Sequence, residues 1–253
     1  MTLAQNTLTP ESYTNRFYRN LVSPDQGVSF QVQEGESDLW IHTDKPREIL
    51  VREALREVRQ ILIDHIEKNP VFETSLDPLP SCPSCHEIIR EMLDAAEDAG
   101  VGPMAGVAGA VAKWVGETLL EDGAPHVLVE NGGDLFLYRP RFSTTIGLFA
   151  GQSPLSLKVG IKIPPTPTPM GIATSSGTVG PSLSFGKADA VCAISTNAVL
   201  ADAAVTAIAN RIQTPEDLEA ALTWGASLEG ITGIAAIIQS RFAAWGAVEV
   251  VKL

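Results

Sequence analysis

The sequence has no long hydrophobic run and no recognisable export signal. Among its 253 residues, no apolar stretch approaches the roughly 18 residues that a membrane-spanning helix requires. The segment from Met1 to Thr14 is polar and lacks the cationic start and apolar stretch of a signal peptide. We therefore expect a cytoplasmic protein that has no membrane partner.

Basic residues are also scarce. The chain carries 18 Lys and Arg against 30 Asp and Glu, which gives a formal net charge of −12 and a pI of about 4.7. A field of that sign repels phosphate backbones, and no Lys/Arg-rich run overrides it locally, so we expect no nucleic-acid partner. A small anionic ligand would need backbone N–H groups or a bound cation to offset its charge. Nothing in the composition indicates an oligomeric state.

Only three cysteines are present, and a cytoplasmic location predicts that they are free thiols. Two of them lie in the run Cys82-Pro83-Ser84-Cys85-His86, which matches the attachment pattern of c-type haem. Haem attachment takes place outside the cytoplasm, so we predict no haem here. Three alternatives stay open: a redox-active pair at a helix start, a metal site that lacks a second cysteine pair, and a loop without a chemical role.

The composition is otherwise that of a globular chain, with 45% hydrophobic and 19% charged residues, and the length suits one domain over residues 1–253. In the first half, alternation of apolar and polar residues predicts a hairpin of strands 28–32 and 38–42. A helix should follow, with Asp44 as its cap and Pro46 in its first turn. A helix over 86–99 that ends at Gly100 and another over 104–120 are expected, with strands at 127–130 and 135–138.

The second half repeats this order of elements. Thr214 begins one of its helices, with Pro215 in the first turn and Asp217 completing a capping box. The other expected elements are a helix at 200–212 and strands at 144–150, 156–163, 189–195, 231–239 and 247–252. We therefore predict an α+β fold of two β-β-α-α-β-β units in one compact body, with pseudo-repeats at 25–140 and 141–253.

Two polar segments could line a ligand site. In the run Asn131-Gly132-Gly133-Asp134, the glycines permit positive φ and a close approach of the backbone to a ligand, although an ordinary hairpin turn is the alternative. A second segment, Gly171–Gly180, could form a loop around phosphate or ribose oxygens, with Lys187 as a nearby cation, or be only a polar surface loop. Its candidate binding residues are Thr174, Ser175, Ser176, Gly177 and Thr178.

A third motif lies on the helix expected at 200–212. Asp202 and Thr206 are four residues apart, so both side chains project from the same helix face. Two hard oxygen donors at this spacing suit Mg²⁺, which is bound through one or two carboxylates and keeps several waters. The alternative is that Asp202 caps the helix, since it falls in the expected first turn.

Taken together, these motifs give the sequence a family resemblance. In this order, they resemble those of the ApbE-like superfamily, whose enzymes are FAD:protein FMN transferases that bind FAD and Mg²⁺. A shorter branch of the superfamily is more similar still, and the resemblance runs from about residue 28 to the C-terminus. It implies a duplicated, T-fold-like architecture. The segments that carry it are Val101–Lys113, Val129–Asp134, Ala173–Gly180 and Ala201–Thr206.

The resemblance also implies roles for the motifs. Asp202 and Thr206 match the metal-ligand motif, Asn131 to Asp134 the flavin-pocket turn, and Thr174 to Thr178 a pocket-lining loop. However, the transferases carry a histidine after that loop, and the corresponding residues 181–189 contain none. The resemblance therefore implies a protein that binds a flavin or other nucleotide with Mg²⁺. It is either a transferase with a relocated base, such as His126 or His86, or a carrier without chemistry, and no catalytic residue is assigned. A thiol redox or haem function through Cys82 and Cys85 is a further alternative.

Overall fold

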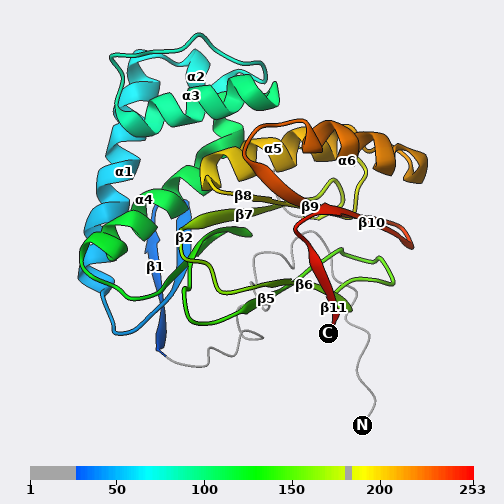
Figure 1. The fold of residues 1–253 in the computed structure, drawn as a ribbon. Helices are drawn as coiled ribbons and strands as arrows, with labels where there is room; N and C mark the ends of the chain where they lie inside the picture. The colour runs from blue at the N-terminus through cyan, green and yellow to red at the C-terminus, as the bar shows by residue number, and fades with distance from the viewer. Residues whose placement is uncertain (1–26, 180–183) are drawn as a thin grey trace.

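A computed structural model describes residues 27–179 and 184–253 of the chain. Its centre is an eight-stranded sheet in which every neighbouring pair is antiparallel. Helices cover one face of this sheet, and a three-stranded antiparallel sheet lies against the other face (Figure 1). The predicted α+β fold class is therefore confirmed.

The strands of the large sheet follow one another in space as β1 (Val28–Glu34), β2 (Ser37–Thr43), β3 (Val127–Asn131), β4 (Asp134–Tyr138), β7 (Met170–Ser175), β8 (Ala190–Ser195), β9 (Ile231–Ile238) and β10 (Arg241–Gly246). The small sheet has the order β11 (Glu249–Lys252), β6 (Val159–Ile163) and β5 (Thr144–Gly147). The described helices are α1 (Glu48–Lys68), α2 (Val71–Thr74), α3 (Glu87–Ala99), α4 (Val107–Glu121), α5 (Ala198–Asn210) and α6 (Leu218–Ala226), with short 3₁₀ turns η3 (Pro103–Gly106) and η4 (Pro215–Asp217).

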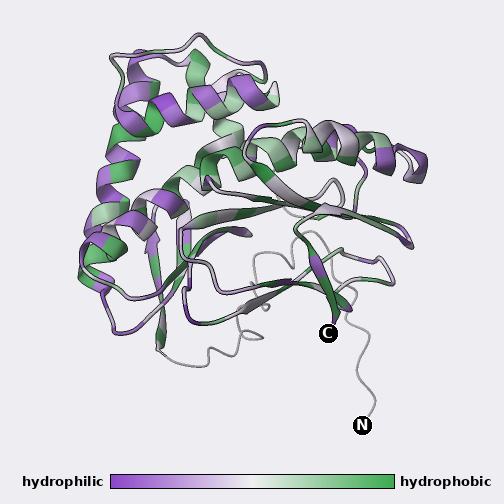
Figure 2. Cartoon of the chain, viewed as in Figure 1, coloured by the Kyte–Doolittle hydropathy of each residue, from purple (hydrophilic) through white to green (hydrophobic). Residues whose placement is uncertain are grey.

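Alternation along the central strands gives the protein two hydrophobic cores. In β3, Val127 and Val129 pack with the helices, whereas Leu128 packs with the small sheet. This is the period of two that a strand buried on both faces requires. The helices differ in how much of their surface is buried. Helices α1 and α3 each bury one face, whereas α5 buries 11 of its 13 residues. Figure 2 shows this contrast as alternating colours on α1 and α3 and a paler, apolar α5. Helix α5 is therefore the central helix of the fold.

Several local predictions are confirmed. The hairpin of β1 and β2 turns at Gly35 and Glu36. Helix α3 begins after His86 and ends at Gly100, whose φ of 68° is the left-handed conformation of a C-cap. Thr214 and Asp217 form the reciprocal hydrogen bonds of a capping box. Local sequence signals thus fix the ends of these elements.

Other predictions are wrong. Helix α1 begins at Glu48 without a side-chain cap, so Asp44 does not cap it. The segment 171–175 forms strand β7 in the middle of the large sheet, where a loop was expected. Strand β10 was not predicted at all. The order of elements in the large sheet, two strands, helices and two strands in each half, is the order that a duplication predicts, but order alone does not test spatial equivalence. The pseudo-repeat therefore stays a prediction.

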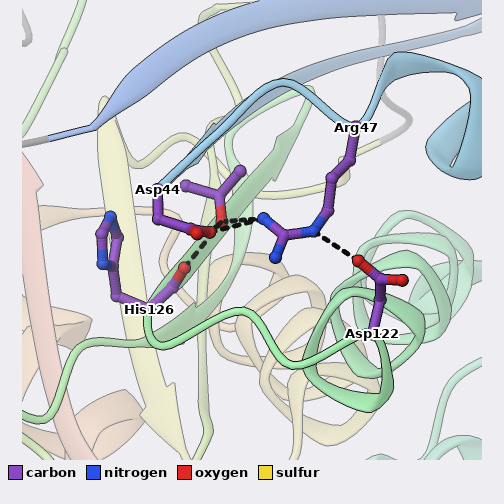
Figure 3. A network of polar contacts seen from close by, with 5 residues as sticks. Asp44, Arg47, Asp122 and His126 are labelled. Carbon is purple, nitrogen blue, oxygen red and sulfur yellow. Dashed lines mark hydrogen bonds and ion pairs between the residues drawn. The ribbon is translucent and has the colours of Figure 1, made fainter.

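Asp44 instead belongs to a network around Arg47 (Figure 3). The Arg47 Nε donates to Asp122 Oδ2 at 2.7 Å, and its Nη1 donates to Asp44 Oδ1 and, at 3.3 Å, to Thr43 Oγ1. The Thr43 hydroxyl in turn donates to the His126 carbonyl at 3.0 Å. These bonds tie the end of β2 to the end of α4 and to the start of β3.

The cysteines also differ from expectation. Cys82 and Cys85 form a disulfide, so the prediction of free thiols is wrong for this pair. Cys192 is free and lies buried in β8. The absence of haem stays a prediction. Among the described residues, no helix is both long and apolar enough to cross a membrane.

Candidate functional site

The candidate site is assembled around the first two turns of α5. This helix packs against β7 and α4 because the facing positions carry no side chain. A Cβ atom at Gly109 would clash with the carbonyl oxygen of Ala198. A Cβ atom at Gly171 would clash with the Cα of Ala198. Glycine is therefore required at both positions, and the close packing brings Asp202 against the start of α4.

Asp202 is not the cap of α5. The cap is Asn197, whose side chain accepts the N–H of Val199 at 2.8 Å, and the helix begins at Ala198. Asp202 thus lies in the second turn, where its own helix leaves no free N–H for it to accept. Its Oδ2 accepts the N–H of Gly109 at 2.8 Å instead. The capping alternative is wrong, and the carboxylate is held across a helix–helix interface.

The Asn131–Asp134 motif forms the turn between β3 and β4. Gly132 and Gly133 have φ values of 69° and 109°, as the two central residues of a type I′ hairpin turn require. The hairpin alternative is therefore right for the backbone. The flanking side chains nevertheless point to their neighbours, since Asn131 Nδ2 donates to the Ala108 carbonyl at 3.1 Å and Asp134 Oδ1 accepts the N–H of Thr174 at 3.1 Å.

These contacts bring the three motifs together. Ala108 contacts Asn131 and the adjacent Gly109 contacts Asp202, so the turn and α5 meet at the start of α4. Thr174 joins them through a second bond, from its hydroxyl to the Gly133 carbonyl at 3.1 Å. Asp134 and Asp202 are close enough for their charges to interact.

The two carboxylates occupy an unfavourable environment for negative charge. Burial, the Asp202 charge and the Glu130 charge raise the pKa of Asp134 well above its ordinary range, against the bond from Thr174. Burial raises the pKa of Asp202 to about 7, although the N–H groups of Gly109 and Ala108 favour its charged form. Within residues 27–179 and 184–253, neither carboxylate forms an ion pair with Lys or Arg. A bound cation would relieve this repulsion.

The donor set suits a hard cation that keeps water ligands. No group of three His, Cys, Asp or Glu side chains in the described residues could enclose a metal. Two carboxylates with nearby amide and carbonyl oxygens match Mg²⁺, which is rarely enclosed by protein ligands alone. Thr206 lies one turn beyond Asp202 on the same face of α5 and is partly buried. The residues present therefore fit Mg²⁺ better than a thiophilic metal.

The segment 174–178 is only partly a loop. Thr174 and Ser175 belong to β7, and the loop begins at Ser176. The Ser176 hydroxyl accepts the N–H of Thr178 at 3.1 Å, and the Thr178 hydroxyl donates to Asp189 Oδ1 at 3.1 Å. The Gly177 N–H donates to the Ala188 carbonyl at 2.9 Å. Within this segment, Thr174 contacts the motif at 131–134. The hydrogen bonds made by residues 176–178 instead connect to their own loop and to residues 188–189. Residues 180–183 lie outside the described part of the chain.

The two histidines considered as relocated bases are engaged elsewhere. His126 precedes β3, whose far end is Asn131, which at about 3.3 Å per residue separates them by roughly 16 Å. His126 lines a separate cavity of about 260 Å³ with Asp44, Arg141 and Phe142. His86 caps α3 and packs its ring on Trp114, with the centroids 5.4 Å apart.

Three site residues were missed from the motifs. Ala108 and Gly109 supply backbone groups to Asn131 and Asp202, and Glu130 is a buried carboxylate whose Oε1 accepts the N–H of Gly133 at 2.8 Å. The one available signal was a glycine within an Ala-rich helical run, which indicates close helix packing. A buried Glu in a strand has no local signal.

Comparison with known proteins places the chain in a family. The sequence profile of the family described as AbpE bacteria matches residues 19–243. A UPF0280 protein of Methanocella arvoryzae is 37% identical over 219 residues, covering 87% of this chain and 88% of its own length. Another from Methanosphaerula palustris is 39% identical over 215 residues, with 84% and 85% covered.

Solved structures show the same fold at low identity. The apo form of the flavinyl transferase ApbE of Pseudomonas stutzeri has a TM-score of 0.54 at 14% identity, covering 89% of this chain and 95% of that one. The flavin transferase ApbE of Vibrio cholerae has a TM-score of 0.51 at 13% identity, covering 88% and 97%. With the profile spanning most of its length, this chain belongs to the AbpE bacteria family, within the ApbE-like superfamily.

Proposed function

We propose that this protein binds a flavin or related nucleotide together with Mg²⁺ at the Asp134–Asp202 site. The observation that carries the proposal is the pair of buried, mutually repelling carboxylates, which form no ion pair with Lys or Arg in the described residues. A nucleotide pyrophosphate entering a protein of net charge −12 also needs a cation. One Mg²⁺ between the carboxylates and the pyrophosphate would meet both needs.

Each residue has a defined part in this proposal. Asp202 and Asp134 hold the cation, with the Thr206 hydroxyl as a further oxygen on α5. The N–H groups of Ala108 and Gly109 favour the charged form of Asp202, against the larger effect of burial. Asn131 fixes the turn against α4, so that Gly132 and Gly133 present bare backbone to a ligand. When bound, Mg²⁺ would neutralise phosphate charge.

Binding without group transfer is the form of this function that we favour. Transfer to a hydroxyl requires a group that accepts its proton, and an imidazole is the usual one. His126 lies at the other end of β3, and His86 is occupied as a helix cap. A flavin carrier in the cytoplasm would need only the pocket and the cation, whereas a transferase would need a base from elsewhere.

The test compares Asp202→Asn with wild type in calorimetric titrations with FAD and with ADP, each with and without Mg²⁺. Asn keeps the shape and the acceptor for Gly109 but removes the charge. We expect Mg²⁺ to tighten wild-type binding about tenfold or more, and the variant to lose this gain. Asp94→Asn, which changes an exposed Asp on α3, is the matched control and should behave as wild type.

Equal affinity in wild type and Asp202→Asn, or the same affinity with and without Mg²⁺, would contradict the metal site. Binding of neither nucleotide would contradict the function itself. A flavinyl mass added to a Thr- or Ser-containing acceptor peptide during incubation with FAD would show transfer and remove the carrier form of the proposal.

A further inference from the structure

The disulfide of Cys82 and Cys85 is a feature that nucleotide binding does not use. The segment that leads from α2 into α3 lies at the edge of the helical layer (Figure 1), and the two cysteines are in its last part by sequence. Both are partly exposed, in contrast to the buried Cys192. Exchange with an external thiol requires such access.

A structural role explains the bond poorly. Disulfides stabilise chiefly by closing long loops in the unfolded chain, and this one joins residues only three positions apart. The same turn is already closed by a backbone hydrogen bond from the Cys85 N–H to the Cys82 carbonyl at 3.0 Å. The bond adds little constraint that the turn does not already have, so its chemistry is the better explanation.

The surroundings of Cys85 favour its thiolate. Cys85 lies directly before His86, the cap of the 13-residue helix α3, so its sulfur is the nearer of the two to a helix N-terminus. His65 on α1 places its Nδ1 3.9 Å from the Cys85 Sγ. Burial, with a contribution from Lys68, lowers the pKa of His65, so the imidazole is neutral at pH 7 and can accept or return a proton. Cys82 has only the Ser84 hydroxyl beside its sulfur, at 3.8 Å.

We propose that Cys82 and Cys85 form a thiol–disulfide exchange site whose substrate is a dithiol, with Cys85 as the leaving thiolate and His65 as its positioning residue. A substrate thiolate attacks Cys82 Sγ, which forms a mixed disulfide and breaks the Cys82–Cys85 bond. The electron pair of that bond leaves on Cys85, because the sulfur with the lower pKa leaves faster.

The second step completes the exchange. The other thiolate of the substrate attacks its own sulfur in the mixed disulfide, so that Cys82 leaves as a thiolate and the substrate becomes a disulfide. Two electrons pass from the dithiol to the cysteine pair. The two protons that the substrate thiols lose are taken up by Cys82 and Cys85, the latter beside the His65 imidazole.

The experiment follows reduction of the native protein by dithiothreitol, with the thiols counted from the mass added by a maleimide reagent. We expect two thiols to react without denaturant, while Cys192 stays unlabelled. His65→Gln should slow reduction about threefold or more near pH 7 and change its pH profile, because the leaving thiolate loses its partner. His86→Asn keeps a cap and is the matched control, with a wild-type rate expected.

A second measurement does not depend on His65 variants folding normally. The rate of alkylation by iodoacetamide against pH gives the thiol pKa in Cys82→Ser, which leaves Cys85, and in Cys85→Ser, which leaves Cys82. We expect the pKa of Cys85 to be lower than that of Cys82. A bond that dithiothreitol reduces only in denaturant, or a Cys85 pKa equal to or above that of Cys82, would overturn the proposal. Equal rates and pH profiles in folded His65→Gln and wild type would do the same.

Discussion

Two polar clusters in this protein differ in how deeply their carboxylates are buried and in which groups face them. In the cluster around Arg47, one guanidinium with a 5% exposed side chain meets Asp44 and Asp122, which are 33% and 47% exposed. In the cluster around Asp202, two buried carboxylates lie close enough for their charges to interact, and each accepts a backbone N–H. In the first cluster each carboxylate has a guanidinium N–H as partner, whereas we propose that the second binds a cation.

The direction of the pKa shifts follows this difference. Hydrogen bonds and charge from Arg47, with a bond from Thr43, lower the pKa of Asp44 in spite of its partial burial. Burial raises the pKa of both Asp134 and Asp202. A protein keeps uncompensated buried charge at a cost in stability, and such groups concentrate at functional sites. We therefore read the Arg47 cluster as a structural tether and the Asp202 cluster as the site.

The largest predicted effect is a pH-dependent instability of the metal-free protein. The pKa of Asp202 is about 7 in the native state against an ordinary value of 3.8, so between these values the native state holds a proton that the unfolded chain releases. The free energy of unfolding should therefore fall as pH rises from 4 to 7, by up to about 4 kcal/mol at 1.36 kcal/mol per pH unit. Urea unfolding in a chelator at pH 5 and pH 8 measures the part of this fall above pH 5, about 3 kcal/mol.

Asp202→Asn isolates the contribution of this carboxylate. His65 and His126 act in the opposite direction. Folding lowers their pKa values, so the stability that these neutral side chains contribute to the protein is lost as pH falls below about 6.5. The variant keeps both histidines, so its difference from wild type reports Asp202 together with the effect of its charge on Asp134. We expect the variant to be more stable than wild type at pH 8 in chelator, and Mg²⁺ to stabilise only the wild type. If the two proteins differ in free energy of unfolding by the same amount at pH 5 and pH 8, the pKa of Asp202 is not raised by folding.

A smaller effect is expected from breaking the balanced cluster. Arg47→Met keeps the apolar stem and leaves Asp44 and Asp122 unpaired, but both carboxylates reach solvent. We expect a loss of about 2 kcal/mol in the free energy of unfolding, below the 3–5 kcal/mol of a fully buried pair. Arg59→Met is the matched control, since Arg59 pairs with the 90% exposed Glu36 and should lose less stability than Arg47→Met.

Measurements of nucleotide binding should further distinguish the roles of the two clusters. Arg47→Met should leave Mg²⁺-dependent affinity for FAD unchanged, because the tether is joined to β2, α4 and β3 at the end opposite to Asn131. A loss of Mg²⁺ dependence in folded Arg47→Met would show that the two clusters are coupled. If Arg47→Met is as stable as wild type, the Arg47 cluster does not act as a structural tether.

How much of this could be predicted from the sequence depends on the range of the interactions. The hairpin of β1 and β2, the C-cap Gly100 and the capping box at Thr214 are fixed by residues within a few positions, and each was predicted. Strand β7 was missed because Thr174 and Ser175 are polar and follow a proline-rich stretch. These two residues pair with Cys192 and Val191 of β8, and the preceding residues 170–172 pair with β4.

The candidate site shows the same limit. The residues Asp134 and Asp202 were named from motifs, but their meeting depends on the contacts of Ala108 and Gly109, which lie about a hundred residues from Asp202 in the sequence. The role of Asp202 was ambiguous because the helix was expected to begin at 200, and its start at Ala198 with Asn197 as cap removes the ambiguity. The Cys82–Cys85 bond was missed because free thiols were inferred from location rather than from geometry.

The smallest predicted effect concerns Thr206. Thr206 lies one turn beyond Asp202 on a helix that is otherwise almost wholly apolar, and it is partly buried where an apolar side chain would pack as well.

The variant Thr206→Val keeps the shape of the side chain and removes the oxygen. If the hydroxyl is a minor cation ligand, the Mg²⁺-dependent affinity for FAD should fall about three- to tenfold, since one neutral ligand contributes less than a carboxylate. Stability in chelator should change by less than about 1 kcal/mol. Thr118→Val is the matched control, because Thr118 is a partly buried helix threonine whose hydroxyl donates to the Trp114 carbonyl of its own helix. Calorimetry of both variants with FAD and Mg²⁺ distinguishes the outcomes, and unchanged affinity in Thr206→Val would reduce the protein ligands of the cation to the two carboxylates.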